Sequence, residues 1–234
     1  MVVMIVAVKQ VEISDRLKEF RAERIEMILA GEVPVKMEGE GRIVLHIVPQ
    51  SAFESPASLD LYAIRQGNNF PAPISDWGGS MRYNFDGLLS VSTGNEYANS
   101  YLQLFHNGTV EAVDSSLLEK HSENLMIASR LFDEGARKIV KRSITLLQEQ
   151  GVEAPLHVML SLLRVKGYFM AVNQFSYRAR DLIDRDNLLV PARVLESYES
   201  DVDQLLLPAL NRVWNASGIA RSPNFDENGK WKER

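Results

Sequence analysis

Hydrophobic and polar residues repeat along the chain with two different periods. Amphipathic helices are predicted where apolar residues recur every three or four positions, in segments 14–30, 125–150 and 201–216. Strands are predicted where apolar residues alternate or run continuously, in segments 42–48, 82–92, 101–106, 109–113, 156–163, 168–172 and 188–195. This order predicts a single α+β domain over residues 1–234, with a mostly antiparallel sheet covered on one face by about three helices.

The clearest local turn signal is the pair Asn-Gly at 107–108, which lies between two strand-like runs. Both central residues of a type I′ hairpin turn need positive φ, which Asn and Gly adopt most readily. A type I′ turn at this place predicts antiparallel pairs of Phe105 with Val110 and of Leu104 with Glu111.

The remaining segments are expected to be irregular or terminal. Residues 1–8 are rich in Val and Ile and predict a short strand, so that residues 1–13 precede the first helix. Residues 51–80 contain three Pro and a Gly pair, which predicts a long irregular segment with one short helix near 58–65. Residues 217–234 are polar and predict an extended C-terminal tail, anchored by Phe225 and Trp231.

The composition narrows the possible function classes. Hydrophobic residues make up 45% and charged residues 24%, and no segment is long and apolar enough for a bilayer, so a soluble cytoplasmic protein is expected. The chain has no Cys, which excludes disulfides, thiolate catalysis and Cys-based zinc sites. The formal net charge of −5 gives no global attraction to nucleic acid, so such binding is expected to be weak and indirect.

The sequence has no motif for catalysis, cofactor binding or metal binding. The patterns GxxxxGK[ST], GxGxxG, HExxH and GxSxG are all absent. His46 and His157 lie inside apolar strand segments, where a core His with one hydrogen-bond partner is favoured over a ligand or base. We therefore predict no catalytic residue, no cofactor and no metal, and the chain is more consistent with a non-enzymatic role.

An acidic cluster has both a functional and a structural interpretation. Asp181, Asp184 and Asp186 could hold a hard cation, as a metal-dependent nuclease requires. Arginines are interleaved with these acids and would neutralise the site, so a solvated charged loop is favoured.

A basic stripe on the helix predicted at 125–150 also has a functional and a structural interpretation. Its cations could contact a phosphate backbone, and they are Arg137, Lys138, Lys141 and Arg142. Glu134 lies four residues before Lys138 as an ion-pair partner within the helix, so a solvated helix face is favoured.

Two arginines break the amphipathic pattern of the first helix. Arg21 and Arg24 lie, by helical spacing, on the same apolar side as Leu17. A buried guanidinium needs a carboxylate, carbonyl or phosphate partner, because an unpaired buried charge is very costly. An internal partner such as Asp86 or Glu111 is favoured, and an anion-binding or interface role for Arg21 and Arg24 is the functional alternative.

A second candidate site is a ligand pocket on the polar face of segment 82–92. Arg82, Asn84 and Asp86 alternate with apolar residues and therefore share one face, and Trp77 lies in the irregular segment beside it. A deep pocket here would favour a ligand sensor, whereas a flat apolar surface would favour a partner-binding domain.

Several separated stretches resemble one bacterial protein type. They are FRAERI at 20–25 and AGE at 30–32, IVLHIVP at 43–49, YNFDGLL at 83–89, YLQLF at 101–105, EAV at 111–113, IDRD at 183–186, LLVP at 188–191, WNA at 214–216 and SPNFD at 222–226. Together they resemble the C-terminal region of bacterial proteins that carry a Schlafen AlbA-type DNA-binding domain. In that family the nucleic-acid-linked domain lies before the first helix, and residues 1–13 are too few to hold it, so no nucleic-acid-binding residue is transferred.

The resemblance implies a non-enzymatic accessory or interaction domain of a Schlafen AlbA-related, nucleic-acid-linked protein. It is expected to act through a protein partner or a homo-oligomer and not at a membrane. A small-ligand or anion sensor is the alternative, and a metal-dependent nuclease is the least favoured.

Overall fold

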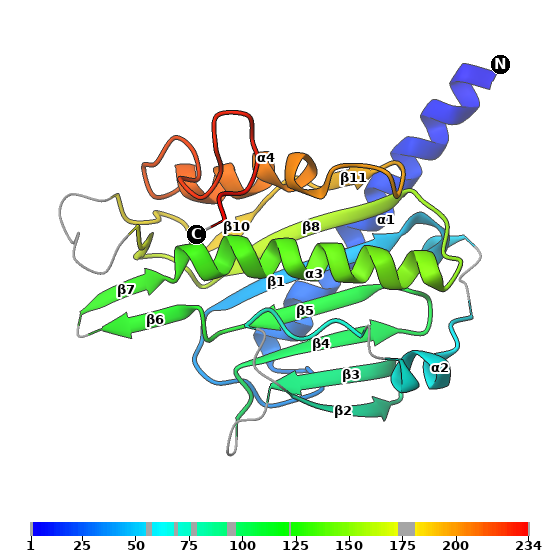
Figure 1. Cartoon of the computed structure of the whole chain (residues 1–234), viewed down its shortest axis with the longest axis horizontal. Helices are drawn as coiled ribbons and strands as arrows, with labels where there is room; N and C mark the ends of the chain where they lie inside the picture. Colours follow the sequence, from blue (N-terminus) through cyan, green and yellow to red (C-terminus); the bar gives the residue numbers. More distant parts are fainter. Residues whose placement is uncertain are drawn as a thin grey trace.

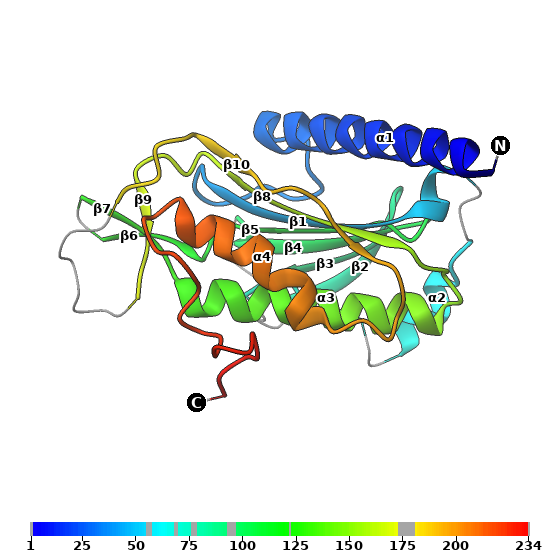
Figure 2. The same cartoon turned by 90° about the horizontal axis from the view of Figure 1, so that it is seen from above.

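The computed structural model describes residues 2–54, 58–67, 70–75, 79–92, 97–121, 123–172 and 181–233, without the side chains of residues 2–10 and 121. It has the α+β fold expected from the sequence, with helices packed on a mostly antiparallel sheet (Figure 1). Helix α1 (Val2–Ala30) covers one face, and α3 (Ser129–Glu149) and α4 (Val202–Asn215) cover the other (Figure 2). The prediction that helices cover only one face is therefore wrong.

The main sheet has the strand order β10-β8-β1-β5-β4-β3-β2, and all of its neighbouring strands are antiparallel. A further short strand, β11, also pairs with β8. The strands are β1 (Arg42–Pro49), β2 (Gly79–Asn84), β3 (Gly87–Ser92), β4 (Ser100–Phe105), β5 (Val110–Asp114), β8 (Leu156–Leu163), β10 (Asn187–Leu189) and β11 (Arg193–Leu195).

A smaller sheet has the order β6-β7-β9, in which β7 and β9 are parallel. Its strands are β6 (Leu118–His121), β7 (Asn124–Ile127) and β9 (Tyr168–Met170). Segment 125–127 was expected in a helix but forms most of β7, because a short apolar run fits either period and here it has strand partners on both sides. The short helix α2 (Leu61–Gln66) lies in the long irregular segment, as predicted. A short 3-10 helix that was not predicted, η1 (Gln50–Phe53), follows β1 directly.

Strand β1 shows why both faces of the sheet are covered. Its apolar residues run without alternation, and a strand of that kind is buried on both sides. Ile43 and Leu45 pack into the main core with the residues of α3 and α4. Val44 belongs to a separate cluster with Ile25 and Ile28 of α1.

The N-terminal segment is helical, so the strand predicted for residues 1–8 is wrong. Helix α1 runs without a break from Val2 to Ala30, and Gly31 ends it with a φ of +79°. Val and Ile cost only tenths of a kcal/mol each in a helix. A helix satisfies its backbone groups internally, whereas a strand needs a neighbour, and no strand pairs with this segment in the described part of the chain.

The β4–β5 hairpin exists, but its register differs from the prediction by one residue. Leu104 pairs with Val110 and Gln103 with Glu111. Gly108 has a φ of +84°, whereas Asn107 does not have positive φ and uses its side-chain oxygen to accept the Thr109 N–H. The connection is therefore a longer loop with one left-handed Gly, and not a type I′ turn.

Two other segments that were predicted as single strands are divided. Segment 82–92 is a hairpin in which β2 and β3 meet at Asn84 and Gly87, and the Asn84 side chain accepts the Gly87 N–H. Segment 188–195 forms β10 and β11, with Pro191 between them. The predictions for β1 and β8 and the Phe225–Trp231 anchor of the tail are confirmed. The Asp201 side chain caps α4 by accepting from the Asp203 and Gln204 N–H groups. No helix among the described residues is long and apolar enough to cross a membrane.

Candidate functional site

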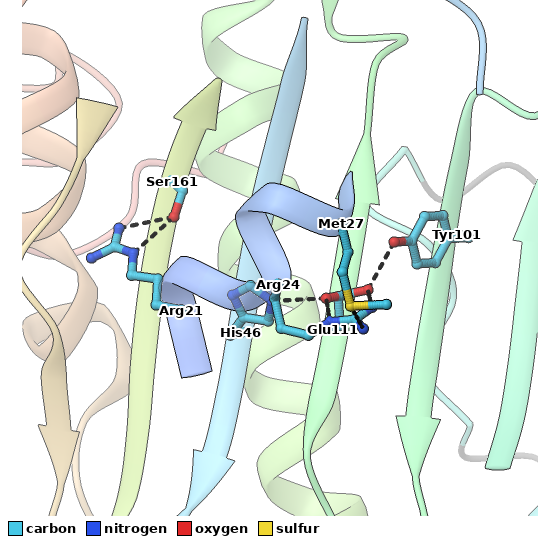
Figure 3. A network of polar contacts seen from close by, with 7 residues as sticks. All are labelled: Arg21, Arg24, Met27, His46, Tyr101, Glu111 and Ser161. Carbon is cyan, nitrogen blue, oxygen red and sulfur yellow. Dashed lines mark hydrogen bonds and ion pairs between the residues drawn. The ribbon is translucent and has the colours of Figure 1, made fainter. Parts of the chain in front are cut away.

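Arg24 of α1 forms a buried ion pair with Glu111 of β5 (Figure 3). Its Nε and Nη2 atoms each donate over 2.8 Å to one carboxylate oxygen of Glu111. The Arg24 side chain is 14% exposed and that of Glu111 is 0% exposed. The sequence placed Arg24 on the inner side of α1 and named Glu111 among its possible partners, and both statements are confirmed.

Glu111 collects two further donors from neighbouring strands. The Tyr101 hydroxyl on β4 donates over 2.8 Å, and His46 Nε2 on β1 donates over 2.9 Å. Burial raises the pKa of Glu111, but the hydrogen bonds from Arg24 and His46 outweigh it and lower that pKa to about 2. Burial and the charge of Glu111 raise the Tyr101 pKa well above its ordinary value. Glu111 is therefore ionised, and its carboxylate accepts hydrogen bonds from Arg24, His46 and Tyr101.

His46 matches the core histidine expected from the sequence. Because an ionised carboxylate only accepts, the proton in this hydrogen bond lies on Nε2. Its buried Nδ1 has no hydrogen-bond partner in the described part of the chain, and the ring packs edge-on against Phe20.

Arg21 lies one turn before Arg24 and binds neutral acceptors only. Nε and Nη2 donate to the Ser161 hydroxyl over 3.0 and 2.9 Å, and Nη1 donates to the Val190 carbonyl over 2.7 Å. Nη2 also donates to the Leu160 carbonyl. Burial without a carboxylate lowers the Arg21 pKa to about 10. Together Arg21 and Arg24 fasten α1 to the two strands β8 and β5 and to Val190 between β10 and β11. This is the internal use of these residues that the sequence favoured.

The predicted sheet-face pocket is not assembled by the residues that the structure describes. Arg82 is exposed on β2 and donates to the Pro34 carbonyl over 3.2 Å, while the Asn84 amide pairs with Gln103 over 2.7 Å. Asp86 is exposed in the β2–β3 turn. Trp77, the fourth predicted member, lies outside the described residues.

The acidic cluster is open to solvent. Asp181, Asp184 and Asp186 are all exposed, and Asp184 approaches Arg185 at 3.8 Å. No group of three possible metal ligands converges within the described ranges. Two of the interleaved arginines, Arg178 and Arg180, lie outside those ranges.

The solvated face predicted for the basic stripe of α3 is found for Lys138, Lys141 and Arg142, which are exposed, but the prediction is wrong for Arg137. Arg137 is buried and binds both carboxylate oxygens of Asp203 on α4, over 2.8 and 2.7 Å. Lys141 approaches the same carboxylate at 3.0 Å, and Lys138 forms the expected pair with Glu134 at 3.1 Å. The helix turns Arg137 towards α4, so its cation is neutralised inside the protein.

Sequence reasoning missed a second buried carboxylate, Asp133 of α3. It accepts hydrogen bonds from Trp214 Nε1 at 3.1 Å, the Ser222 hydroxyl at 2.5 Å and Asn224 Nδ2 at 2.8 Å. Burial raises the Asp133 pKa to about 6 despite these donors. The available signal was a polar residue beside Phe132 within the apolar stripe of α3.

Two surface hollows lie beside α4. One, of about 350 Å³, lies between α4 and the C-terminal segment 221–232. The other, of about 330 Å³, lies between the β10 region and the last turns of α4. Neither includes Arg21, Arg24, Glu111 or the described residues of the predicted sheet-face pocket. Comparison of the chain with protein-family models, curated proteins and solved structures finds no match.

Proposed function

We propose that this chain is a non-enzymatic accessory and interaction domain of a Schlafen AlbA-related, nucleic-acid-linked bacterial protein. The observation that supports this proposal is that the buried polar side chains beneath α1 bind one another. Glu111, His46 and Tyr101 resemble catalytic residues by type, but they bind one another and Arg24 beneath α1. All three side chains are fully buried, and none of them lines either of the two hollows described above.

The network supports an interaction role because it attaches one half of α1 to the sheet, while the other half extends from the molecule as an arm. Arg21 and Arg24 attach its C-terminal half to the sheet, where Leu17 and Ile28 are buried. In Figure 1 the N-terminal end of the same helix stands clear of the rest of the molecule. Its sequence from Val2 to Val8 is apolar at every position. A helix that is apolar all round is stable in water only when other chain segments cover it.

The partner that fits this arm best is the same arm of a second copy of the chain. Residues 2–8 carry no charge, so their partner surface must be apolar. The large apolar residues exposed elsewhere, such as Tyr62, Phe85 and Leu182, belong to different elements. Pairing of two α1 arms would cover the apolar residues of each copy with those of the other, and such two-fold contacts are the commonest in oligomers.

Nucleic acid is expected to associate with such an assembly through other parts of it, because this chain should bind nucleic acid only weakly. The formal net charge is −5, and Arg137 of the basic stripe is already paired with Asp203. The affinity of the isolated chain for nucleic acid should therefore be about micromolar or weaker near physiological salt and should fall steeply as salt is added.

Light scattering after size exclusion tests the proposed interaction. The wild-type chain should form a dimer that dissociates on dilution, and Ile5→Asp should be monomeric with an unchanged circular dichroism spectrum. Leu182→Asp is the control, since Leu182 is an exposed apolar residue, at 57%, that lies outside α1. A wild type that is monomeric at every concentration, or a control that dissociates as readily as Ile5→Asp, contradicts pairing through α1.

A further inference from the structure

The C-terminal segment is irregular, yet side chains of two helices hold it in place. Asp133 on α3 accepts from the side chains of Ser222 and Asn224. On α4, Asn211 Oδ1 accepts the Ser222 N–H over 2.8 Å, and Gln204 Nε2 donates to the Asn228 carbonyl over 2.9 Å. The segment thus has a defined conformation without belonging to a helix or strand.

The far end of the segment is fixed by close packing and by an aromatic clamp. Gly229 is buried with a φ of +74°, and a Cβ there would lie 2.8 Å from Gln204 Nε2. The guanidinium groups of Arg130 and Arg137 lie 4.7 and 4.2 Å from the centre of the Trp231 ring. A loop held by its neighbours in one conformation is the kind of element that forms pre-organised binding sites.

The hollow of about 350 Å³ lies between this segment and α4, and its size is at the small end for a ligand site. Leu207 of α4 and Phe225 of the segment supply its apolar lining. Figure 1 shows α4 in orange and the C-terminal segment in red beside it. A compact ligand with a small apolar part fits these dimensions.

The lining carries both signs of charge, and one group of each sign is free. Asp226 accepts the Asn228 and Lys230 N–H groups, and the Lys232 ammonium donates to the Pro223 carbonyl. Arg221 and Glu227 also line the hollow, and both are exposed. Neither has a hydrogen bond or ion pair with any other described residue.

We propose that this hollow binds a small zwitterion of the free amino-acid class. Its carboxylate would pair with Arg221, its ammonium with Glu227, and an apolar side chain would pack on Phe225 and Leu207. A simple anion would be repelled by the acidic residues of the lining, and a simple cation would be repelled by its basic residues. A zwitterion has an opposite charge to pair with each kind. This ligand site is separate from the α1 arm and adds a sensing role to the proposed interaction domain.

Titration calorimetry with free L-leucine and L-phenylalanine tests the site on the intact chain. Binding of at least one of them is expected. The methyl esters lack the carboxylate and the N-acetyl derivatives lack the ammonium, so both should bind more weakly. Arg221→Ala and Glu227→Ala should each weaken binding by roughly ten- to a hundredfold, the range for one charge-assisted hydrogen bond.

Lys166→Ala is the matched control, because Lys166 is exposed and lies outside the lining of the hollow. All of the altered side chains are exposed, and circular dichroism should confirm that every variant folds as the wild type does. Absence of binding for both amino acids overturns the proposal. So does equal binding of the esters and N-acetyl derivatives, or binding that neither variant weakens more than the control does.

Discussion

Arg24 donates to both carboxylate oxygens of Glu111, and each of the two hydrogen bonds spans 2.8 Å. The pair joins α1 to β5 beneath the helix, where the Glu111 side chain is completely buried. Removal of one partner from a buried ion pair is far more costly than the pair's own net contribution, because the other charge stays buried without compensation. The attachment of α1 is therefore sensitive to single substitutions at this point.

Arg24→Ala should lower the free energy of unfolding by about 3–5 kcal/mol, because it leaves the Glu111 carboxylate unpaired in the core. Lys18→Ala on the same helix is the control. Lys18 is 73% exposed and pairs with the exposed Asp15. Lys18→Ala should therefore lower the free energy of unfolding by less than about 1 kcal/mol. Urea denaturation of both variants measures the difference. Equal stabilities would show that the pair contributes nothing beyond a surface contact.

Glu111 should make the protein sensitive to acid. Its pKa in the folded state is about 2, against 4.5 for an unperturbed Glu, so the unfolded chain binds the proton more readily between these values. Stability from this group is fully present above pH 4.5 and is lost as the pH falls towards 2, by roughly 3 kcal/mol in total. Glu111→Gln should flatten the acid side of a stability-against-pH curve. A curve as steep as that of the wild type would contradict this account.

Asp133 should act in the opposite direction. Its folded-state pKa is about 6, against an ordinary 3.8, so the folded protein binds the proton more readily between these values. Stability from this group is present below pH 3.8 and is lost as the pH rises to 6, by roughly 3 kcal/mol. In Asp133→Asn this slope should disappear, and urea denaturation across the window measures it. The Glu111 and Asp133 windows overlap only from 3.8 to 4.5, which keeps the two effects separable.

The purified chain should hydrolyse neither ATP nor nucleic acid. No phosphate-binding loop exists in the sequence, and Asp184 is 82% exposed with the Arg185 guanidinium 3.8 Å from its carboxylate. Release of phosphate from ATP and cleavage of labelled RNA or DNA, each with added Mg²⁺, are the assays. Turnover that vanishes in Asp184→Ala would establish a catalytic metal site at the acidic cluster.

The positions of Arg21 and Arg24 could be predicted because helical spacing is a local property. Leu17 and Ile28 define the buried side of α1, and the arginines follow from the period alone. Their partners lie up to 169 residues away, so spacing could name possible acceptors but not assign them. The one-residue register difference in the β4–β5 hairpin arose because the Asn107 backbone does not adopt the left-handed conformation. Its side chain instead accepts the Thr109 N–H and forms a local turn.

Asp133 could not be found in this way. Two of its donors, Ser222 and Asn224, lie 89 and 91 residues further along the chain, in a segment without periodicity. Arg137 was placed on a solvated face because its partner Asp203 belongs to a helix whose packing angle the sequence does not reveal. Local periods thus assigned most elements, while contacts between distant segments decided the role of the charged residues.

The hydrogen bond from Arg21 to the Val190 carbonyl has a further consequence for the edge of the sheet. Val190 lies between β10 and β11, the two short strands that end the sheet beyond β8, and Pro191 follows it directly. A long uninterrupted edge strand would offer a template for a strand from another molecule, and proteins avoid this with short strands and Pro at their edges. Because the Val190 carbonyl accepts from Arg21, it is not free to pair with a strand of another molecule, and Pro191 has no N–H to offer one.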